Sequence, residues 1–249
     1  GIRDLVRSRG LGDVYKRQEP NPSAPPVATF SIVGYDPKTG DLGVAVQSKI
    51  FAVGSVVPWA KAGVGAVATQ SYANVDYGPQ GLERLAKGQS ARETVDALTK
   101  ADANRRLRQL GIVDAKGRSA SFTGSGCKHW AGHIEKPNFC AQGNILTGEE
   151  VVRSMVSSYE QAQKKTGTGL CDWLALALMD GQKAGGDSRG RQSAALLVVR
   201  KNGGYAGGND RFIDLRVDDH KTPIAELLRL LSIHKKMFRR AHENPPKAG

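Results

Sequence analysis

A threonine at the start of an apolar run is the residue of this chain best suited to nucleophilic chemistry. Thr29 opens the run Thr-Phe-Ser-Ile-Val. The neighbouring run ends in Gln47, Ser48 and Lys49. If the chain were cut between Ala28 and Thr29, a single residue would carry both a hydroxyl and a free α-amine. An α-amine titrates near pH ~8, so it can accept the hydroxyl proton close to neutrality. The alternative is an ordinary strand threonine, because β-branched residues favour strands.

Three further residues are candidates for catalysis beside Thr29. Lys49 could lower the pKa of the nucleophile electrostatically, although a lysine at a strand end is as often simply solvated. Gln47 and Ser48 alternate faces of a strand, so at most one points towards Thr29, and Ser48 is favoured. Asn144 follows a glycine at a strand end, where its amide N–H could bind an oxyanion or belong to an ordinary turn.

Substrate contacts are expected from Gln47, Gln70 and Arg191. Arg191 lies in a glycine-rich loop with Asp187 and Arg189. An arginine in this loop could hold a substrate carboxylate in bidentate fashion, whereas the alternative is a set of solvated loop charges.

The cysteines and histidines do not form a recognisable metal site. Cys127 and Cys140 could form a disulfide in an exported protein or remain buried thiols in a cytosolic one. His129 and His133 between them give a Cys-x-His-x3-His-x6-Cys pattern. Zinc sites usually start from a cysteine pair two to four residues apart, so no metal ligands are expected.

The net charge of +12 at first suggests a nucleic-acid partner. The excess is concentrated at the two ends, because residues 1–18 carry a net +3 and residues 234–249 a net +4. No RNA-binding aromatic motif or zinc-finger spacing is present, so nucleic acid is not an expected partner. No apolar run is long enough for a membrane span.

The chain divides into four expected regions. Residues 1–18 match nothing downstream and are expected to be a non-native or disordered leader, followed by a proline-rich connector over 19–28. Residues 29–238 are expected to form one domain, and 239–249 a basic tail. No apolar export core is visible, but a native signal peptide could have been lost if residues 1–18 replaced the native start. Both a cytoplasmic and a periplasmic location therefore remain open.

The elements that must position these residues follow from apolar periodicity and turn residues. A hairpin is expected over 29–35 and 42–48. Further strands are expected at 55–59, 64–70, 105–114, 118–123, within 128–144, 192–199 and 211–217, and helices at 77–88, at 90–102 and from 147, 170 and 222. Ser90 and Thr147 each precede a glutamate in capping-box register. Helices in blocks predict an α+β fold, with two antiparallel sheets in a four-layer αββα sandwich.

The order of several short sequence blocks resembles that of one bacterial family. These blocks are TFSIV, GVAVQSK, VGSVVPWA, GVGAVATQ, YGPQGLE, WAGH, AQGN, GRQSAALLVV and DLRVDDH. They resemble domain-of-unknown-function family 1028, a family grouped with the N-terminal-nucleophile (Ntn) hydrolases. The resemblance covers about three quarters of the chain. It implies an αββα fold with Thr29 as the nucleophile.

Two functions follow as expectations from this resemblance. The first is hydrolysis of a small amide or peptide-like C–N bond through Thr29, without a metal or organic cofactor. The second is a non-catalytic Ntn-fold protein that binds a ligand or assembles with a partner, and a homo-oligomer is left open. The chain departs from the pattern in two places: the second strand lacks the aspartate found in proteasome-like relatives, and Ala28 stands where many self-cleaving Ntn enzymes have glycine.

Overall fold

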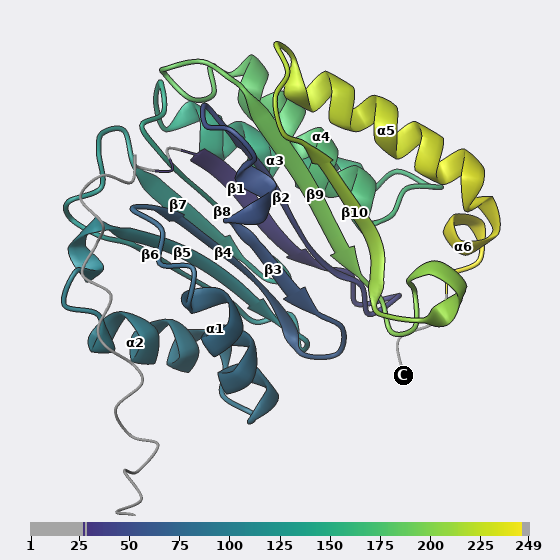
Figure 1. Ribbon diagram of the computed structural model, residues 1–249, viewed down its shortest axis with the longest axis horizontal. Helices are drawn as coiled ribbons and strands as arrows, with labels where there is room; N and C mark the ends of the chain where they lie inside the picture. The colour runs from purple at the N-terminus through teal and green to yellow at the C-terminus, as the bar shows by residue number, and fades with distance from the viewer. Residues whose placement is uncertain (1–26, 28, 246–249) are drawn as a thin grey trace, which may run out of the picture.

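Two antiparallel sheets lie face to face in the computed structural model, which describes Val27 and residues 29–245 (Figure 1). The strands are β1 (Thr29–Tyr35), β2 (Leu42–Ser48), β3 (Pro58–Lys61), β4 (Gly65–Ser71), β5 (Arg108–Asp114), β6 (Ser119–Thr123), β7 (Gly132–Lys136), β8 (Phe139–Asn144), β9 (Ser193–Val199) and β10 (Arg211–Val217). One sheet has the order β10-β9-β2-β1-β8-β7 and the other β3-β4-β5-β6. The hairpin predicted from the sequence therefore supplies the two central strands of the larger sheet.

Helices cover the outer face of each sheet. The helices are α1 (Tyr77–Ala86), α2 (Ala91–Ala101), α3 (Glu150–Gln163), α4 (Leu170–Lys183), α5 (Pro223–Met237) and α6 (Arg239–Glu243), with 3-10 turns η1 (Val53–Ser55), η2 (Arg105–Leu107) and η3 (Tyr205–Gly207). Helices α1 and α2 pack on the four-stranded sheet, whereas α3, α4 and α5 pack on the six-stranded sheet. The predicted α+β class and four-layer αββα sandwich are confirmed.

Strand β1 is buried on both faces, and its alternation decides which residues face the other sheet. Phe30 and Ile32 belong to the apolar cluster under the helices. Val33 belongs to the cluster between the two sheets. Because side chains alternate along a strand, Thr29 and Ser31 share the inter-sheet face with Val33.

Helix α4 approaches the six-stranded sheet closely because two glycines lie opposite each other beneath it. Gly34 and Gly43 are paired across the hairpin. A Cβ at Gly34 would lie 2.7 Å from the Tyr159 hydroxyl, and one at Gly43 would lie 2.9 Å from Leu174. Side chains at either position would push α3 and α4 outwards, so the glycines set the spacing of these two layers.

Two local predictions have different outcomes. The capping box at Ser90 is confirmed, since its hydroxyl accepts from the Glu93 N–H and the Glu93 carboxylate accepts from the Ser90 N–H. The capping box at Thr147 is wrong, because α3 begins at Glu150 without a side-chain cap. Thr147 instead lies against Gly185, in the loop after α4.

Two strand boundaries shift because short 3-10 turns replace strand ends. The strand expected over 55–59 is turn η1 followed by β3, and the first residues of 105–114 form η2.

The expected basic tail starts with helix α6, which the Arg200 guanidinium holds by donating to the Ala241 carbonyl at 2.8 Å. The predicted leader over 1–18 lies outside the described residues, as does the connector apart from Val27.

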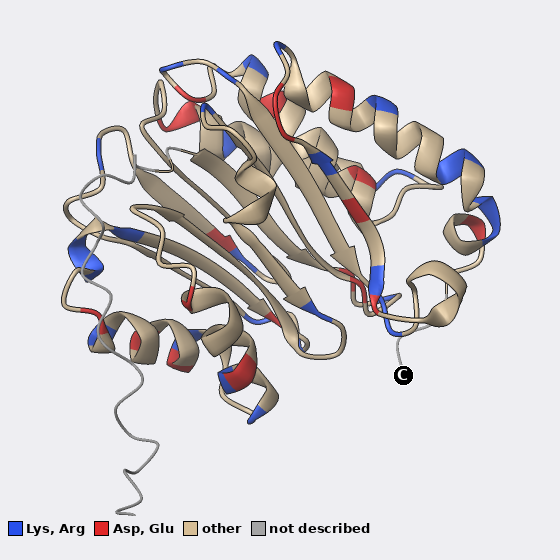
Figure 2. Cartoon of the chain, in the orientation of Figure 1, with Lys and Arg blue, Asp and Glu red and all other residues tan. Residues whose placement is uncertain are grey.

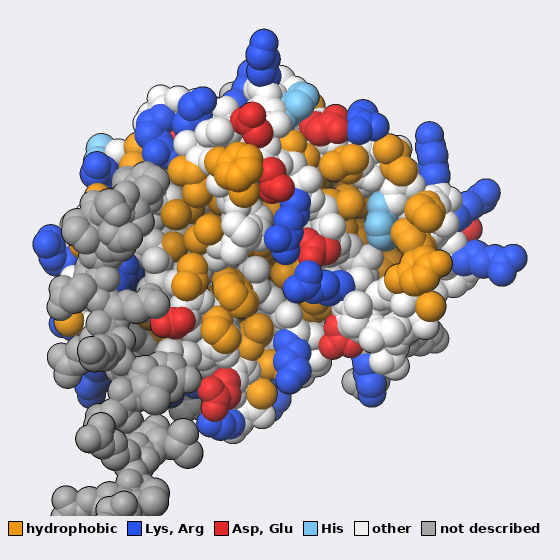
Figure 3. Space-filling view, in the orientation of Figure 1, with side chains coloured by type: hydrophobic (Ala, Val, Ile, Leu, Met, Phe, Trp, Pro, Cys, Tyr) orange, Lys and Arg blue, Asp and Glu red, His pale blue; other side chains and the backbone are white. Residues whose placement is uncertain are grey.

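Charged side chains are mixed in sign over the surface. Figure 2 shows basic and acidic residues on the helices and loops, while the central strands carry few of either. The face in Figure 3 also intersperses the two signs, around scattered apolar side chains. Within the described part of the chain, none of the helices has the length and apolar character needed to cross a membrane.

A histidine pair joins α5 to α6. His234 Nε2 donates to the Phe212 carbonyl at 3.0 Å, so its Nδ1 accepts from His242 Nε2 at 3.0 Å. Burial, together with His234, Lys235 and Arg200, lowers the pKa of His242 to about 4, and Asp172 opposes this shift.

We expect the histidine pair to make the protein less stable in acid. In the unfolded chain His242 binds a proton near pH ~6.5, whereas in the folded chain its pKa is about 4. The stability gained by keeping His242 neutral is present above pH ~6.5 and is lost as the pH falls towards 4. The thermal midpoint, measured between pH 7 and 4.5, should therefore fall less steeply for His242→Asn than for the wild type. Parallel curves for the two proteins would contradict this assignment.

Candidate active site

Thr29 begins the central strand pair and lies in a row of polar residues across the six-stranded sheet. It is paired with Ser48 of β2 on one side and with Asn144 of β8 on the other. Ser48 is in turn paired with Ser193 of β9. Directly opposed residues share a face, so these four side chains point towards the four-stranded sheet. All four are buried. The structure thus brings Thr29, Ser48 and Asn144 together in one row on the same face of the sheet.

A layer of buried, uncharged polar side chains, four amides and the hydroxyl of Ser31, lies beneath Thr29. We call this set the amide layer; it comprises Ser31, Gln70, Gln109, Gln142 and Asn144, all at most 1% exposed. Gln142 Nε2 donates to Ser31 Oγ at 2.6 Å, and Ser31 donates to Gln70 Oε1 at 2.6 Å. Gln70 Nε2 then donates to Gln109 Oε1 at 2.8 Å and lies 3.4 Å from the Thr29 carbonyl. The chain of bonds crosses between the two sheets.

Gln109 of β5 is the centre of the amide layer. Its Oε1 accepts from Gln70 and, at 2.9 Å, from Asn144 Nδ2. Its Nε2 donates to the Gly143 carbonyl at 2.8 Å and to Thr123 Oγ1 at 2.9 Å. Asn144 thereby commits one of its two amide hydrogens to the layer and keeps one for another acceptor.

The amide layer contains no ionisable group. Gln142 packs over Gly111 of β5, where any side chain would overlap its amide. Uncharged donors and acceptors can be buried without the large penalty of an unpaired charge, provided that they are bonded to one another. Gln142 Oε1 is the exception, since it has no partner in the described chain. The other side chains of the layer are bonded, and they give the start of β1 a neutral, polar floor.

The Val27 carbonyl oxygen marks a position between a hydroxyl and a backbone donor. Thr29 Oγ1 donates to this oxygen at 2.9 Å. The Ser71 N–H donates to the same oxygen at 3.0 Å. A carbonyl oxygen at this point is thus within hydrogen-bond reach of the candidate nucleophile and of a fixed N–H group, which is the arrangement required of an oxyanion site.

Ser71 adopts a strained conformation that its surroundings hold in place. Its φ of 67° lies in the left-handed region, which is unusual for a residue other than glycine. The guanidinium of Arg108 donates to the next carbonyl, that of Tyr72, at 2.6 Å and pairs with Asp102 at 2.8 Å. Burial opposes ionisation of Asp102, but hydrogen bonds from Arg108, the Asn104 N–H and Tyr77 keep its pKa below the usual value.

The glycine-rich loop after α4 ties together the ends of the strands that flank Thr29. The buried Asp187 carboxylate accepts from the Lys49 N–H at 3.2 Å and pairs with Arg189 at 2.9 Å. Ser188 donates to the carbonyl of Ile145, just past β8, from both its N–H and its hydroxyl. Arg189 therefore binds an internal carboxylate, where the sequence suggested a substrate carboxylate.

The remaining predicted residues are not brought against the Thr29 hydroxyl. Lys49 is exposed just past β2, with its Cδ beside Gly190. Arg191 is exposed and forms no ion pair with another described residue. Gln47 is paired with Phe30 and shares its helix-facing side, and its buried amide has no hydrogen-bond partner in the described chain. Gln70 belongs to the amide layer and contacts the Thr29 backbone.

The cysteines do not contribute to the site. Cys127, Cys140 and Cys171 are free thiols, so the disulfide alternative is not what the structure contains. Burial raises the pKa of Cys140 to about 12, which leaves it a poor nucleophile at neutral pH.

Two functional elements escape the sequence analysis. Gln109 stands inside the expected strand 105–114, where a glutamine among apolar residues was a usable sign of a buried polar contact. The Ser71 N–H is a backbone group, and no residue type identifies it in advance. Both depend on β4 and β5 lying against β1 and β8.

We expect Gln109→Leu to destabilise the fold strongly. The change removes the acceptor of Asn144, the nearer of the two acceptors of Gln70 and a side-chain donor to the Gly143 carbonyl, which should lower the free energy of unfolding by at least about 2 kcal/mol. Urea denaturation measures the loss. Thr123→Val removes one bond of Gln109, together with the partly exposed contact between Thr123 Oγ1 and His133 Nδ1, and is the matched control, at about 1 kcal/mol. Equal losses for the two variants would contradict a central role for Gln109.

Comparison with known proteins identifies the family of this chain. The model of the "Family of unknown function (DUF1028)" matches residues 29–227. A crystal structure of a protein of that family from Silicibacter pomeroyi is 30% identical, with a TM-score of 0.75, covering 84% of this chain and 86% of its own. Eukaryotic HslV from Trypanosoma brucei is 10% identical, with a TM-score of 0.44, covering 68% of this chain and 98% of its own. No curated protein matches the sequence. The family match spans the whole sandwich up to α5, and on that basis the chain belongs to DUF1028.

Proposed function

We propose that this protein is an Ntn-type amidohydrolase in which Thr29 becomes the nucleophile once it is the first residue of the chain. The observation that carries the proposal is the position of the Val27 carbonyl oxygen, 2.9 Å from Thr29 Oγ1 and 3.0 Å from the Ser71 nitrogen. A substrate carbonyl at the same point would meet both the attacking oxygen and an oxyanion donor.

The proposed reaction proceeds through an ester on Thr29. The α-amine takes the proton from Oγ1, and Oγ1 attacks the carbonyl carbon of a small amide or peptide-like bond. The Ser71 N–H, with the free amide hydrogen of Asn144, stabilises the negative oxygen that forms. The C–N bond then breaks, and the leaving amine takes the proton from the α-ammonium group. Water, deprotonated by the α-amine, finally hydrolyses the ester. This sequence requires no metal or organic cofactor.

The surrounding residues support this role in different ways. The amide layer fixes the backbone of Thr29 from below, because Gln70 contacts its carbonyl. Ser48, which is paired with Thr29 across the hairpin, would hydrogen-bond the hydroxyl or the new amine. Lys49, Arg191 and Gln47 do not contact Thr29, so we assign to the two exposed cations only an attraction for anionic substrates at the rim.

The second candidate function is that of a non-catalytic binding or assembly protein. The observation in its favour is that Thr29 is fully buried and its hydroxyl is bonded to the chain's own Val27 carbonyl. In that case the same hydrogen bonds serve only to close the end of the sandwich.

The mature N-terminus decides between the two functions. Protein made from its native start should be analysed by intact mass and N-terminal sequencing, beside Thr29→Val, which keeps the shape of the side chain without its hydroxyl. The enzyme hypothesis expects a chain that starts at Thr29. The enzyme hypothesis would be wrong if the chain always kept residues before Thr29 and if Thr29→Val retained an undiminished hydrolytic activity.

A further inference from the structure

A large cavity lies at the end of the sandwich opposite Thr29. It has a volume of about 770 Å³ and lies between the β1–β2 turn (36–41), the loop joining α3 to α4 (164–169) and α6. We call it the α6 cavity. Its size is within the roughly 300–1,000 Å³ of small-molecule sites. Thr29 and Asp36 are separated by the length of β1, roughly 23 Å at 3.3 Å per residue, so the cavity is distinct from the candidate active site.

The α6 cavity has an apolar inner wall. Leu170, Trp173, Val198 and Phe212 contribute to its lining. The Trp173 indole N–H is already bonded to Thr168 Oγ1 at 3.0 Å, so the ring offers the cavity only apolar surface. Such a wall suits the hydrocarbon or aromatic body of a ligand better than a bare inorganic ion.

The four carboxylates that line the cavity are already satisfied. Asp41 is paired with Arg200 at 2.6 Å, and Asp172 with Lys235 at 2.6 Å. Glu243 is paired with Arg239 at 2.6 Å. The carboxylate of Asp36 accepts from the Lys38 N–H at 2.9 Å and from the Thr39 hydroxyl at 3.1 Å.

Two ammonium groups at the same cavity have no such partner. Lys38 comes from the β1–β2 turn and Lys165 from the α3–α4 loop, and both are exposed lining residues. Within the described chain, neither ammonium forms an ion pair or hydrogen bond. Asp36 has neutral hydrogen-bond donors but no cationic partner, so the five lysines and arginines and the four carboxylates of the lining leave a net charge of +1. The chemistry that would complete the cavity is therefore a hydrogen-bond acceptor with a negative charge.

The loop that carries Lys165 leaves space for a ligand. Gly167 and Gly169 have no atom within 4 Å of the position where a Cβ would stand. Side chains at these positions would extend into that open space, whereas the glycines keep it clear. Gly167 also has a φ of 74°, a conformation that favours glycine.

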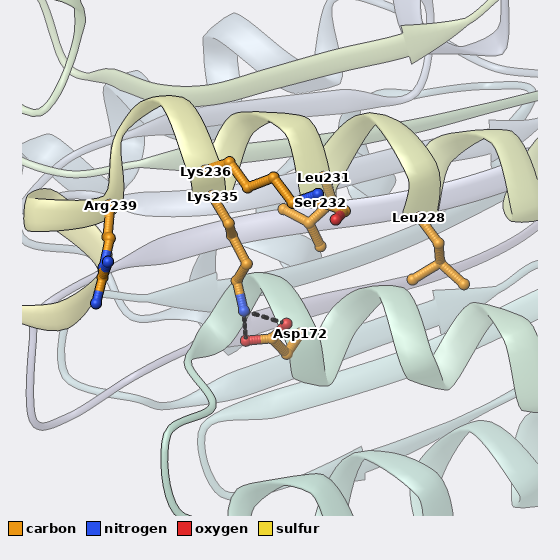
Figure 4. Close-up of a pocket in the computed structure, with 7 residues that line it drawn as sticks. All are labelled: Asp172, Leu228, Leu231, Ser232, Lys235, Lys236 and Arg239. Atoms are coloured by element: carbon orange, nitrogen blue, oxygen red, sulfur yellow. Dashed lines mark hydrogen bonds and ion pairs between the residues drawn. The ribbon is translucent and has the colours of Figure 1, made fainter.

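An ion pair separates the α6 cavity from a second hollow. A groove of about 450 Å³ between α4 and α5 shares Asp172, Lys235 and Arg239 with the cavity. Figure 4 shows Lys235 reaching from α5 to both carboxylate oxygens of Asp172, with Leu228 and Leu231 directed towards α4. Lys235 is thus committed to holding α5 on α4, which leaves Lys38 and Lys165 as the cations for a ligand.

We propose that the α6 cavity is a binding site for a small organic carboxylate. Its carboxylate lies between Lys38 and Lys165, and its apolar body lies along Leu170 and Trp173. The site does not depend on Thr29, and its failure would leave the proposed reaction untouched.

The test compares two ligands of one shape and opposite charge. Binding of indole-3-acetate and of tryptamine to the full chain is measured by titration calorimetry, with benzoate as a smaller carboxylate. Wild type is expected to bind the two carboxylates with a Kd in the millimolar range or tighter, and to bind tryptamine at least about tenfold more weakly. Failure of both carboxylates to bind, or equal binding of tryptamine, would overturn the proposal.

Charge reversal then locates the site. The double variant Lys38→Glu with Lys165→Glu should weaken binding of indole-3-acetate at least about tenfold, because attraction becomes repulsion. Lys100→Glu, on the last turn of the remote α2, is the matched control and should bind as the wild type does. Both charge changes lie on exposed side chains, so the thermal midpoint should stay near that of the wild type. Unchanged binding in the double variant would place the ligand elsewhere and overturn the assignment.

Discussion

A chain that begins at Thr29 is expected to hydrolyse its amide substrate at least about 10³-fold faster than the chain in which residues 1–28 precede it. The reason is that the preceding residues remove the α-amine, which is the only base the proposed mechanism supplies. They also place the Val27 carbonyl oxygen where the substrate oxygen would bind, between Thr29 and the Ser71 N–H. Both effects disappear when the chain starts at Thr29.

The measurement does not need the natural substrate. A small peptide epoxyketone has a carbonyl that the Thr29 hydroxyl can attack and an epoxide that the α-amine can then open. The product keeps every atom of the probe, so intact mass should rise by one probe mass per chain. Labelling therefore requires the hydroxyl and the free amine on the same residue.

Three variants make the labelling decisive. Thr29→Ser keeps a hydroxyl and should still be labelled, whereas Thr29→Val should not be labelled at all. The chain that retains residues 1–28 should also remain unlabelled. Labelling of Thr29→Val would show that another nucleophile reacts, and the mechanism would then be wrong.

The largest effect on stability is expected from the Arg200 side chain. Arg200 and Asp41 form a bidentate pair with N–O distances of 2.7 and 2.6 Å, and their side chains are only 9% and 5% exposed. The Arg200 guanidinium also lies 3.8 Å from the centroid of the Phe212 ring. Arg200→Met leaves a buried carboxylate without its partner, so the free energy of unfolding should fall by about 3–5 kcal/mol.

The double variant separates the charge from the packing. Adding Asp41→Leu to Arg200→Met removes the unpaired carboxylate and should restore most of the loss, because a buried ion pair replaced by apolar groups is often nearly neutral. Denaturant midpoints of the two proteins give the comparison. Arg229→Met breaks an exposed pair with Glu226 and is the control, with almost no change expected. A double variant less stable than Arg200→Met would contradict this account.

The hairpin illustrates what local sequence can determine. A turn of fixed length between β1 and β2 sets their register, and the register places Ser48 opposite Thr29. The alternation of side chains along β2 then sends Gln47 to the helix side. The preference for Ser48 over Gln47 therefore rests on geometry that the sequence contains.

The amide layer illustrates what local sequence cannot determine. Gln109 bonds to the Gly143 carbonyl and to Asn144, both on β8, although β5 and β8 belong to different sheets. No periodicity in either segment states which strand of one sheet faces which strand of the other. The partners of Asn144 could therefore not be predicted, even though Asn144 itself was.

The place of β1 in the sheet has a mechanical consequence. Its neighbours β2 and β8 both run antiparallel to it, so its hydrogen bonds lie across the strand on both sides. A force that pulls β1 by its amino end acts along the strand, at right angles to its hydrogen bonds with β2 and β8. Many of these bonds must therefore break together. An aminopeptidase or unfoldase working from that end would pass the Val27–Ser71 bridge and then meet this resistance at Thr29. The sandwich thus resists removal of residues beyond the start of β1.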